Sequence, residues 1–164
     1  MFRYNGVYIG SDTPIGIVKN CGLISGEGSY LSSGNGIVSA SDINKLFNNG
    51  VISGARKEMS TSDQWAVGSG IALLTSTTIN ELHNKGIIKG YSVNGERRKE
   101  AGSGIALTAS SSLNSLNNLG IISGNNPDSI IAAYGVMNRQ TSDAVKKGVN
   151  NGVISVSYTH LRAH

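Results

Sequence analysis

The sequence has few of the residues that build disulfide scaffolds, membrane spans or histidine-based sites. Its 164 residues include one cysteine, Cys21, so a disulfide framework is excluded and we expect Cys21 to be a small apolar filler. No run reaches the roughly 18 apolar residues of a transmembrane helix, and the N-terminus does not resemble a signal peptide. Of three histidines, His160 and His164 lie in the last five residues. Histidine catalysis and histidine metal sites are therefore not expected.

The last nine residues, VSYTHLRAH from Val156 to His164, differ in pattern from the rest. They resemble a translation of the transposon-end adaptor used in preparing sequencing libraries. We therefore treat 156–164 as a non-native tail and 1–155 as a partial repeat domain, a fragment of a longer protein. Without Arg162 the formal net charge falls from +4 to +3. This modest charge is unlike that of a nucleic-acid binder, so no nucleic-acid partner is expected.

One motif of about a dozen residues occurs five times. INKLFNNGVISG starts at Ile43, INELHNKGIIKG at Ile79 and LNSLNNLGIISG at Leu113, and weaker copies start at Ile15 and Val145. Each copy has a central glycine, with asparagine two residues before it and isoleucine two residues after it. The central glycines, separated by 28, 36, 34 and 32 residues, are Gly22, Gly50, Gly86, Gly120 and Gly152.

The repeat combines a constant frame with variable segments. GNGI or GSGI precedes three of the copies, while most of the length variation falls in EGSYLSS, ARKEMSTSDQWAV, YSVNGERRKEA and NNPDSIIAA. Repetition at this period is typical of a solenoid, in which each repeat packs only on its neighbours. The 22 glycines, two prolines and many asparagines favour short strands and turns over long helices.

The short segments GIAL, INEL and GIIKG, bounded by Gly, Asn or Ser, predict three strands per repeat. Joined by bends, they would form one coil of a parallel β-helix, giving about five coils of 28–36 residues in an all-β fold. A helical interpretation would use Ser41 or Asp42 as a cap, but the helix would have barely two turns. A leucine-rich-repeat-like horseshoe and a helical array remain as alternatives.

In such a coil, equivalent residues stack about 4.8 Å apart. The isoleucines would fill a dry interior, and the asparagines would form an amide ladder. Asn44, Asn80 and Asn114 predict a second, shorter ladder, and the central glycines are expected to supply unusual φ angles. The residue after each central glycine is also apolar, so either the variable segments cover it or a bend falls there. These residues are Leu23, Val51, Ile87, Ile121 and Val153.

No catalytic, cofactor-binding or metal site is predicted, and no cofactor is expected. The loop carboxylates Glu58, Asp63, Glu96 and Glu100 are interpreted as solvated charge, as is the cluster Arg97, Arg98 and Lys99. Trp65 is the best candidate for ligand contact by stacking, although packing against the rod is the simpler interpretation. Lys45 and Glu81 share a register position and are expected to pair across coils, and His83 is expected to point outward.

The run SGI, then IN.L.N, then G.I.G, with variable polar loops, resembles the passenger repeats of large autotransporter adhesins of Gram-negative bacteria. The resemblance extends from about Ile15 to Ser155. It implies a right-handed parallel β-helix that is exported to the cell surface through a C-terminal outer-membrane β-barrel translocator, which would belong to a missing part of the protein.

Two functions follow as hypotheses. The first is a non-enzymatic segment of a secreted, cell-surface adhesin whose loops contact a host-cell or bacterial surface protein or glycan. The second is part of a β-helical carbohydrate-active enzyme or tailspike-like depolymerase, which would use paired carboxylates held in a groove. A cytoplasmic repeat scaffold is a third possibility.

Overall fold

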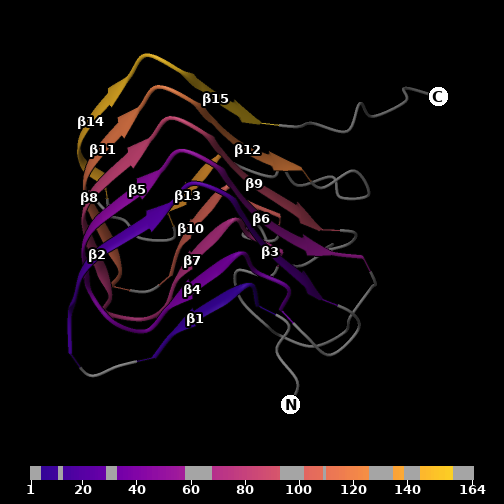
Figure 1. Ribbon diagram of the computed structural model, residues 1–164, viewed down its shortest axis with the longest axis horizontal. Helices are drawn as coiled ribbons and strands as arrows, with labels where there is room; N and C mark the ends of the chain where they lie inside the picture. The colour runs from indigo at the N-terminus through magenta and orange to yellow at the C-terminus, as the bar shows by residue number, and fades with distance from the viewer. Residues whose placement is uncertain are drawn as a thin grey trace.

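The protein is a β-solenoid, seen in a computed structural model that describes residues 5–10, 13–28, 33–57, 68–92, 102–108, 110–125, 135–138 and 145–156 (Figure 1). All regular elements in these ranges are strands, and each repeat supplies one strand to each of three parallel sheets. Within the same ranges, no helix is long and apolar enough to cross a membrane. The predicted all-β solenoid is confirmed, and the helical array and the helical interpretation of 43–50 are wrong.

Three sheets enclose the interior. Sheet A contains β1 (Val7–Ile9), β4 (Ile37–Ser39), β7 (Ile71–Leu73), β10 (Ile105–Leu107) and β13 (Val136–Asn138). Sheet B contains β2 (Ile15–Asn20), β5 (Ile43–Asn48), β8 (Thr78–Asn84), β11 (Ser112–Asn118) and β14 (Val145–Asn150). Sheet C contains β3 (Leu23–Gly28), β6 (Val51–Arg56), β9 (Ile87–Ser92), β12 (Ile121–Asn125) and β15 (Val153–Val156).

The predicted isoleucine column forms the centre of the core. Along sheet C, Ile24 pairs in register with Ile52, and the same alignment continues to Ile88, Ile122 and Ile154. The three middle members are fully buried, whereas Ile24 is half-buried and Ile154 is exposed at the two ends of the stack. The dry interior is therefore closed over about three turns.

The predicted asparagine ladder is continuous through all five repeats. Asn20 Nδ2 donates to Asn48 Oδ1 at 2.8 Å, and the same 2.8 Å bond recurs from Asn48 to Asn84, from Asn84 to Asn118 and from Asn118 to Asn150. Several of these amides also donate to a backbone carbonyl of the next repeat, such as Asn84 Nδ2 to Ile121 O at 3.2 Å. Buried amides are thus satisfied by equivalents above and below them.

The central glycines are required for a different reason from the one predicted. Among the glycines of the described ranges, a positive φ occurs at Gly34, Gly68 and Gly102, which open the GNGI and GSGI segments, and not at the central positions. A Cβ on Gly86 would lie 1.9 Å from Gly50 O, so any side chain there would collide with the backbone of the preceding turn. Close stacking of corners selects the central glycine in every repeat but the first, since a Cβ on Gly22 would meet nothing within 4 Å.

The apolar residue after each central glycine points outward, which resolves the two alternatives left open by the sequence. It is the first residue of each sheet C strand, and its neighbour in the isoleucine column points inward. Exposure reaches 71% at Leu23 and 53% at Val153 in the two end turns, whereas Val51 and Ile87 are half-buried. Cys21, at the adjacent corner, is exposed as well. Its predicted role as a buried filler is wrong.

Candidate interaction surface

The loop residues singled out from the sequence lie outside the described ranges. They are Glu58, Asp63, Trp65, Glu96, Arg97, Arg98, Lys99 and Glu100. The structure does describe the two strands that flank each loop. The sequence interpretations of these residues therefore stay predictions.

The long connections of the solenoid all depart from one edge. They join the ends of sheet C strands to the starts of sheet A strands and comprise residues 29–36, 57–70, 93–104 and 126–135, which are 8, 14, 12 and 10 residues long. In contrast, the corner between sheets B and C is two residues long in every repeat, as at Asn49 and Gly50. Sequence variation is therefore concentrated at one edge of a constant frame.

The outer face of sheet B carries a small polar and aromatic cluster. Lys45 Nζ lies 3.1 Å from Glu81 Oε1, which confirms the predicted pair, and His83 Nε2 lies 3.1 Å from Glu81 Oε2. The imidazole ring also stacks on Phe47, with ring centroids 4.9 Å apart and an interplanar angle of 15°. His83 points outward as predicted, but its stacking on Phe47 was not predicted, although the two residues share a register position between β5 and β8.

The cluster affects the ionisation of its carboxylate. The hydrogen bond with His83, and then the hydrogen bond with Lys45, lower the pKa of Glu81 from its ordinary value. Glu81 is a surface group, so solvent screens these interactions. The arrangement favours an ionised carboxylate that links two repeats, which is a structural role for these side chains.

The described carboxylates do not form a catalytic pair. Glu27 bonds to Lys57 at 2.8 Å, Asp42 accepts the Thr78 backbone N–H at 2.7 Å, and Glu81 belongs to the cluster above. No group of three or more His, Cys, Asp or Glu side chains that could hold a metal occurs in the described part of the chain.

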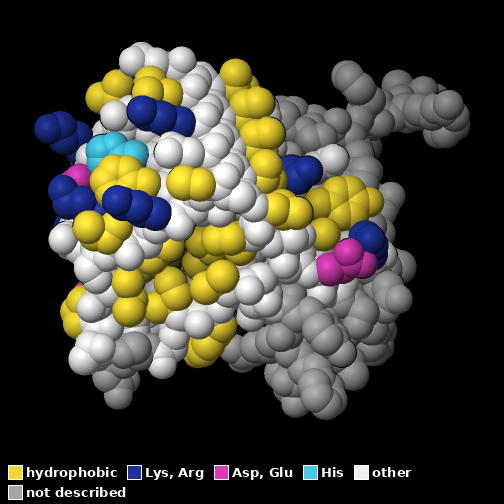
Figure 2. Space-filling view, in the orientation of Figure 1, with side chains coloured by type: hydrophobic (Ala, Val, Ile, Leu, Met, Phe, Trp, Pro, Cys, Tyr) yellow, Lys and Arg dark blue, Asp and Glu magenta, His cyan; other side chains and the backbone are white. Residues whose placement is uncertain are grey.

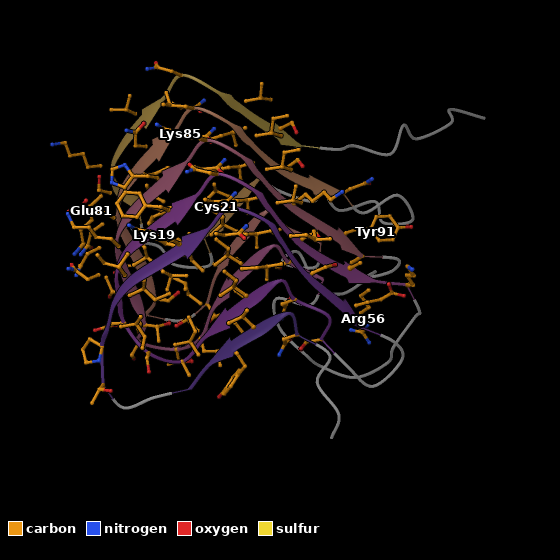
Figure 3. The ribbon with its side chains drawn as sticks, viewed as in Figure 1. Lys19, Cys21, Arg56, Glu81, Lys85 and Tyr91 are labelled. Atoms are coloured by element: carbon orange, nitrogen blue, oxygen red, sulfur yellow. The ribbon has the colours of Figure 1, made fainter. Side chains whose placement is uncertain are left out.

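A buried cation, Arg56, was not predicted from the sequence. It is 4% exposed at the end of β6, and its neighbours in the register of sheet C are Gly28 and Ser92 (Figure 3). Burial lowers the pKa of the Arg56 guanidinium. The period-two alternation that points Ile52 and Gly54 inward also points Arg56 inward, so the strand pattern contained this signal. Arg56 falls in the variable segment ARKEMSTSDQWAV, so it was not assigned to a strand.

Comparison of the chain with protein-family models, with curated proteins and with solved structures finds no match. Function is therefore argued from the surface that the solenoid presents.

Proposed function

We propose that this chain is a non-enzymatic, adhesive segment of a secreted cell-surface protein of the autotransporter passenger kind. The observation that carries the proposal is the contrast between two corners of the coil. The connections from sheet C to sheet A vary from 8 to 14 residues, while the connections from sheet B to sheet C keep two residues. A frame that tolerates variation at one edge is suited to presenting different contact loops.

The rigidity of the solenoid supports a role in presenting loops to a partner. Side chains stack in register across three sheets, and the buried amide ladder links every repeat to the next, so a loop is held on a stiff support. Preorganised support lowers the entropic cost of binding. The proposed partners are surface proteins or glycans of host or bacterial cells, and the proposed location is the cell surface, reached through a β-barrel translocator in the full-length protein.

A loop replacement tests the proposal. Replacing residues 57–70 by the shorter connection 29–36 should reduce adhesion of protein-coated beads to a panel of mammalian and bacterial cells. The thermal unfolding midpoint should stay close to the original, since the flanking strands β6 and β7 are unchanged. A reverse exchange, with 57–70 placed at 29–36, serves as the matched control for loop position.

Two outcomes would contradict the proposal. One is adhesion that persists after all four long connections are exchanged. The other is cleavage of a polysaccharide by the unmodified chain that disappears when Glu58, Asp63, Glu96 and Glu100 are changed to glutamine, which would establish the depolymerase hypothesis instead.

A further inference from the structure

An exposed apolar column runs along the solenoid beside the corner between sheets B and C. It consists of the first residue of each sheet C strand, and Figure 2 shows hydrophobic side chains in a continuous file on this face. Leu119 and Val149, which are 48% and 51% exposed, widen it on the side of sheet B. The apolar column comprises Leu23, Val51, Ile87, Ile121 and Val153.

The column is not explained by packing within the described ranges. Its members pair in register from Leu23 to Val51 and onward to Val153, so they are spaced by about 4.8 Å and extend about 20 Å along the axis. Leu23, Ile121 and Val153 are 71%, 40% and 53% exposed, and Val51 and Ile87 between them are half-buried. A contiguous apolar row of this kind on a soluble surface marks an interaction site.

Lysines border the column on both sides. Lys85 lies at the corner two residues before Ile87, and Lys89 lies two residues after it. On the neighbouring sheet B, Lys19 lies four residues before Leu23 and Lys147 lies six residues before Val153. Figure 3 labels Lys19 and Lys85. Among the described residues none of these four lysines forms an ion pair, whereas Lys45 and Lys57 do. The carboxylate of sheet B, Glu81, already contacts Lys45 and His83. The column and these four lysines together form the apolar–lysine face.

We propose that the apolar–lysine face binds the surface of an anionic lipid bilayer, with the solenoid axis lying along the membrane. Aliphatic side chains would enter the interfacial region while the lysines contact lipid headgroups, as in other peripheral membrane surfaces. This goes beyond the proposed adhesive function and does not depend on it. The variable connections leave from the opposite ends of the sheet C strands and would remain accessible.

The shape and charge of the face favour a bilayer over other occupants. The corner between sheets B and C lies at the apex of each coil in Figure 1, so the column is on an outer edge of the solenoid. A second copy of this face would bring lysines against lysines, which is repulsive. A soluble polyanion would neutralise the lysines but leave the aliphatic column in water. A bilayer satisfies both parts of the face.

Vesicle co-sedimentation tests the proposal on the full chain. The probes are vesicles of phosphatidylcholine alone and of phosphatidylcholine mixed with phosphatidylglycerol. We expect binding to the anionic vesicles that weakens with added salt. Lys85→Gln with Lys89→Gln should weaken it by about five-fold per lysine. Leu23→Ser with Ile121→Ser and Val153→Ser should weaken it by more than about ten-fold.

Two matched controls should retain binding. Tyr8→Ser removes an apolar side chain that is 54% exposed on sheet A, away from the face, and Lys57→Gln removes a lysine at the other end of β6. All substituted aliphatic residues are exposed, so we expect their replacement to leave the unfolding midpoint unchanged. An unchanged midpoint will show that each variant is folded.

Three results would overturn the inference. The first is absence of binding to the anionic vesicles. The second is unweakened binding by the variant with Leu23→Ser, Ile121→Ser and Val153→Ser, which would indicate a purely electrostatic contact with polyanions. The third is an equal loss of binding in the control variants. Vesicle binding by a chain with exchanged loops separates this inference from the adhesive function, because that chain should lose cell adhesion and keep vesicle binding.

Discussion

At the scale of single residues, Asn84 connects three turns of the coil. Its side chain is fully buried, accepts from Asn48 Nδ2 and donates to both Asn118 Oδ1 and Ile121 O. The predicted second, shorter ladder of Asn44, Asn80 and Asn114 is also present, and Asn80 is its middle residue. Asn80 donates to Asn44 Oδ1 at 3.4 Å and accepts from Asn114 Nδ2 at 2.7 Å. The two asparagines differ mainly in burial.

Asn84→Ala should lower the free energy of unfolding by about 1–3 kcal/mol, because the buried amides of Asn48 and Asn118 lose partners that water cannot replace. Asn80→Ala should cost less than about 0.5 kcal/mol, since its exposed partners can bond to water. Urea unfolding of both variants measures the difference. Equal costs would mean that the inner ladder adds nothing beyond ordinary surface hydrogen bonds.

A second prediction at this scale concerns pH. The pKa of Glu81 is lower in the folded chain than in the unfolded chain, so the ionised carboxylate stabilises the fold. This contribution is complete above the ordinary glutamate pKa and is lost as the pH falls through the depressed folded value. Urea unfolding over a series of acidic pH values should therefore show a shallower acid-side decline for Glu81→Gln than for the original chain.

A titration of Glu81 followed by NMR checks the cause directly. His83→Ala should move the pKa of Glu81 back toward its ordinary value, because the hydrogen bond with His83 is the largest influence on it. An unchanged titration in this variant would assign the shift to Lys45 instead.

At the scale of elements, the corner between sheets B and C depends on glycine for space. Gly86→Ala places a methyl group 1.9 Å from Gly50 O, so the corner must open, and we expect a loss of about 1–3 kcal/mol or more in unfolding free energy. Gly22→Ala is the matched control, because a methyl group at that corner would meet no atom of another turn within 4 Å. Denaturant unfolding midpoints of the two variants should differ clearly.

The strands could be predicted because each register position repeats the same chemistry five times. Ile52, Ile88 and Ile122 could be aligned from the sequence alone, and so could the asparagines two residues before each glycine. The reason for the glycines could not, because the approach of Gly86 to Gly50 O depends on how closely two turns stack. The surroundings of Leu23 were also undetermined, since the sequence does not show whether a loop covers it or a bend falls there.

The surface was harder to predict than the frame. The Lys45–Glu81 pair followed from a shared register position, and the structure confirms it. The stacking of His83 on Phe47 was missed because a shared register position does not fix side-chain orientation, and the inward direction of Arg56 was missed because that residue falls in a variable segment. The apolar–lysine face joins residues of two sheets, so no single segment of sequence displays it.

At the scale of the whole molecule, stability depends on a continuous core rather than on any one repeat. Ile88→Asp puts a charge at a fully buried site in the middle of the isoleucine column, where no countercharge is available among the aliphatic side chains of the core. We expect this variant to lose cooperative unfolding and its β-type circular dichroism spectrum.

Ile121→Asp is the matched control, since Ile121 is 40% exposed and its side chain points away from the core. It should keep both the spectrum and a single unfolding transition. Loss of cooperativity in both variants, or in neither, would contradict the assignment of inward and outward rows.

The amide ladders also have a direction. The inner asparagines from Asn20 to Asn118 each donate to the turn that follows, whereas Asn80 and Asn114 in the outer ladder donate to the turn that precedes them. Along the inner ladder each repeat thus presents an amide donor on one side and an amide acceptor on the other. A repeat duplicated or deleted at the glycine corners would keep the inner amides matched, whereas an inverted repeat would place donor against donor.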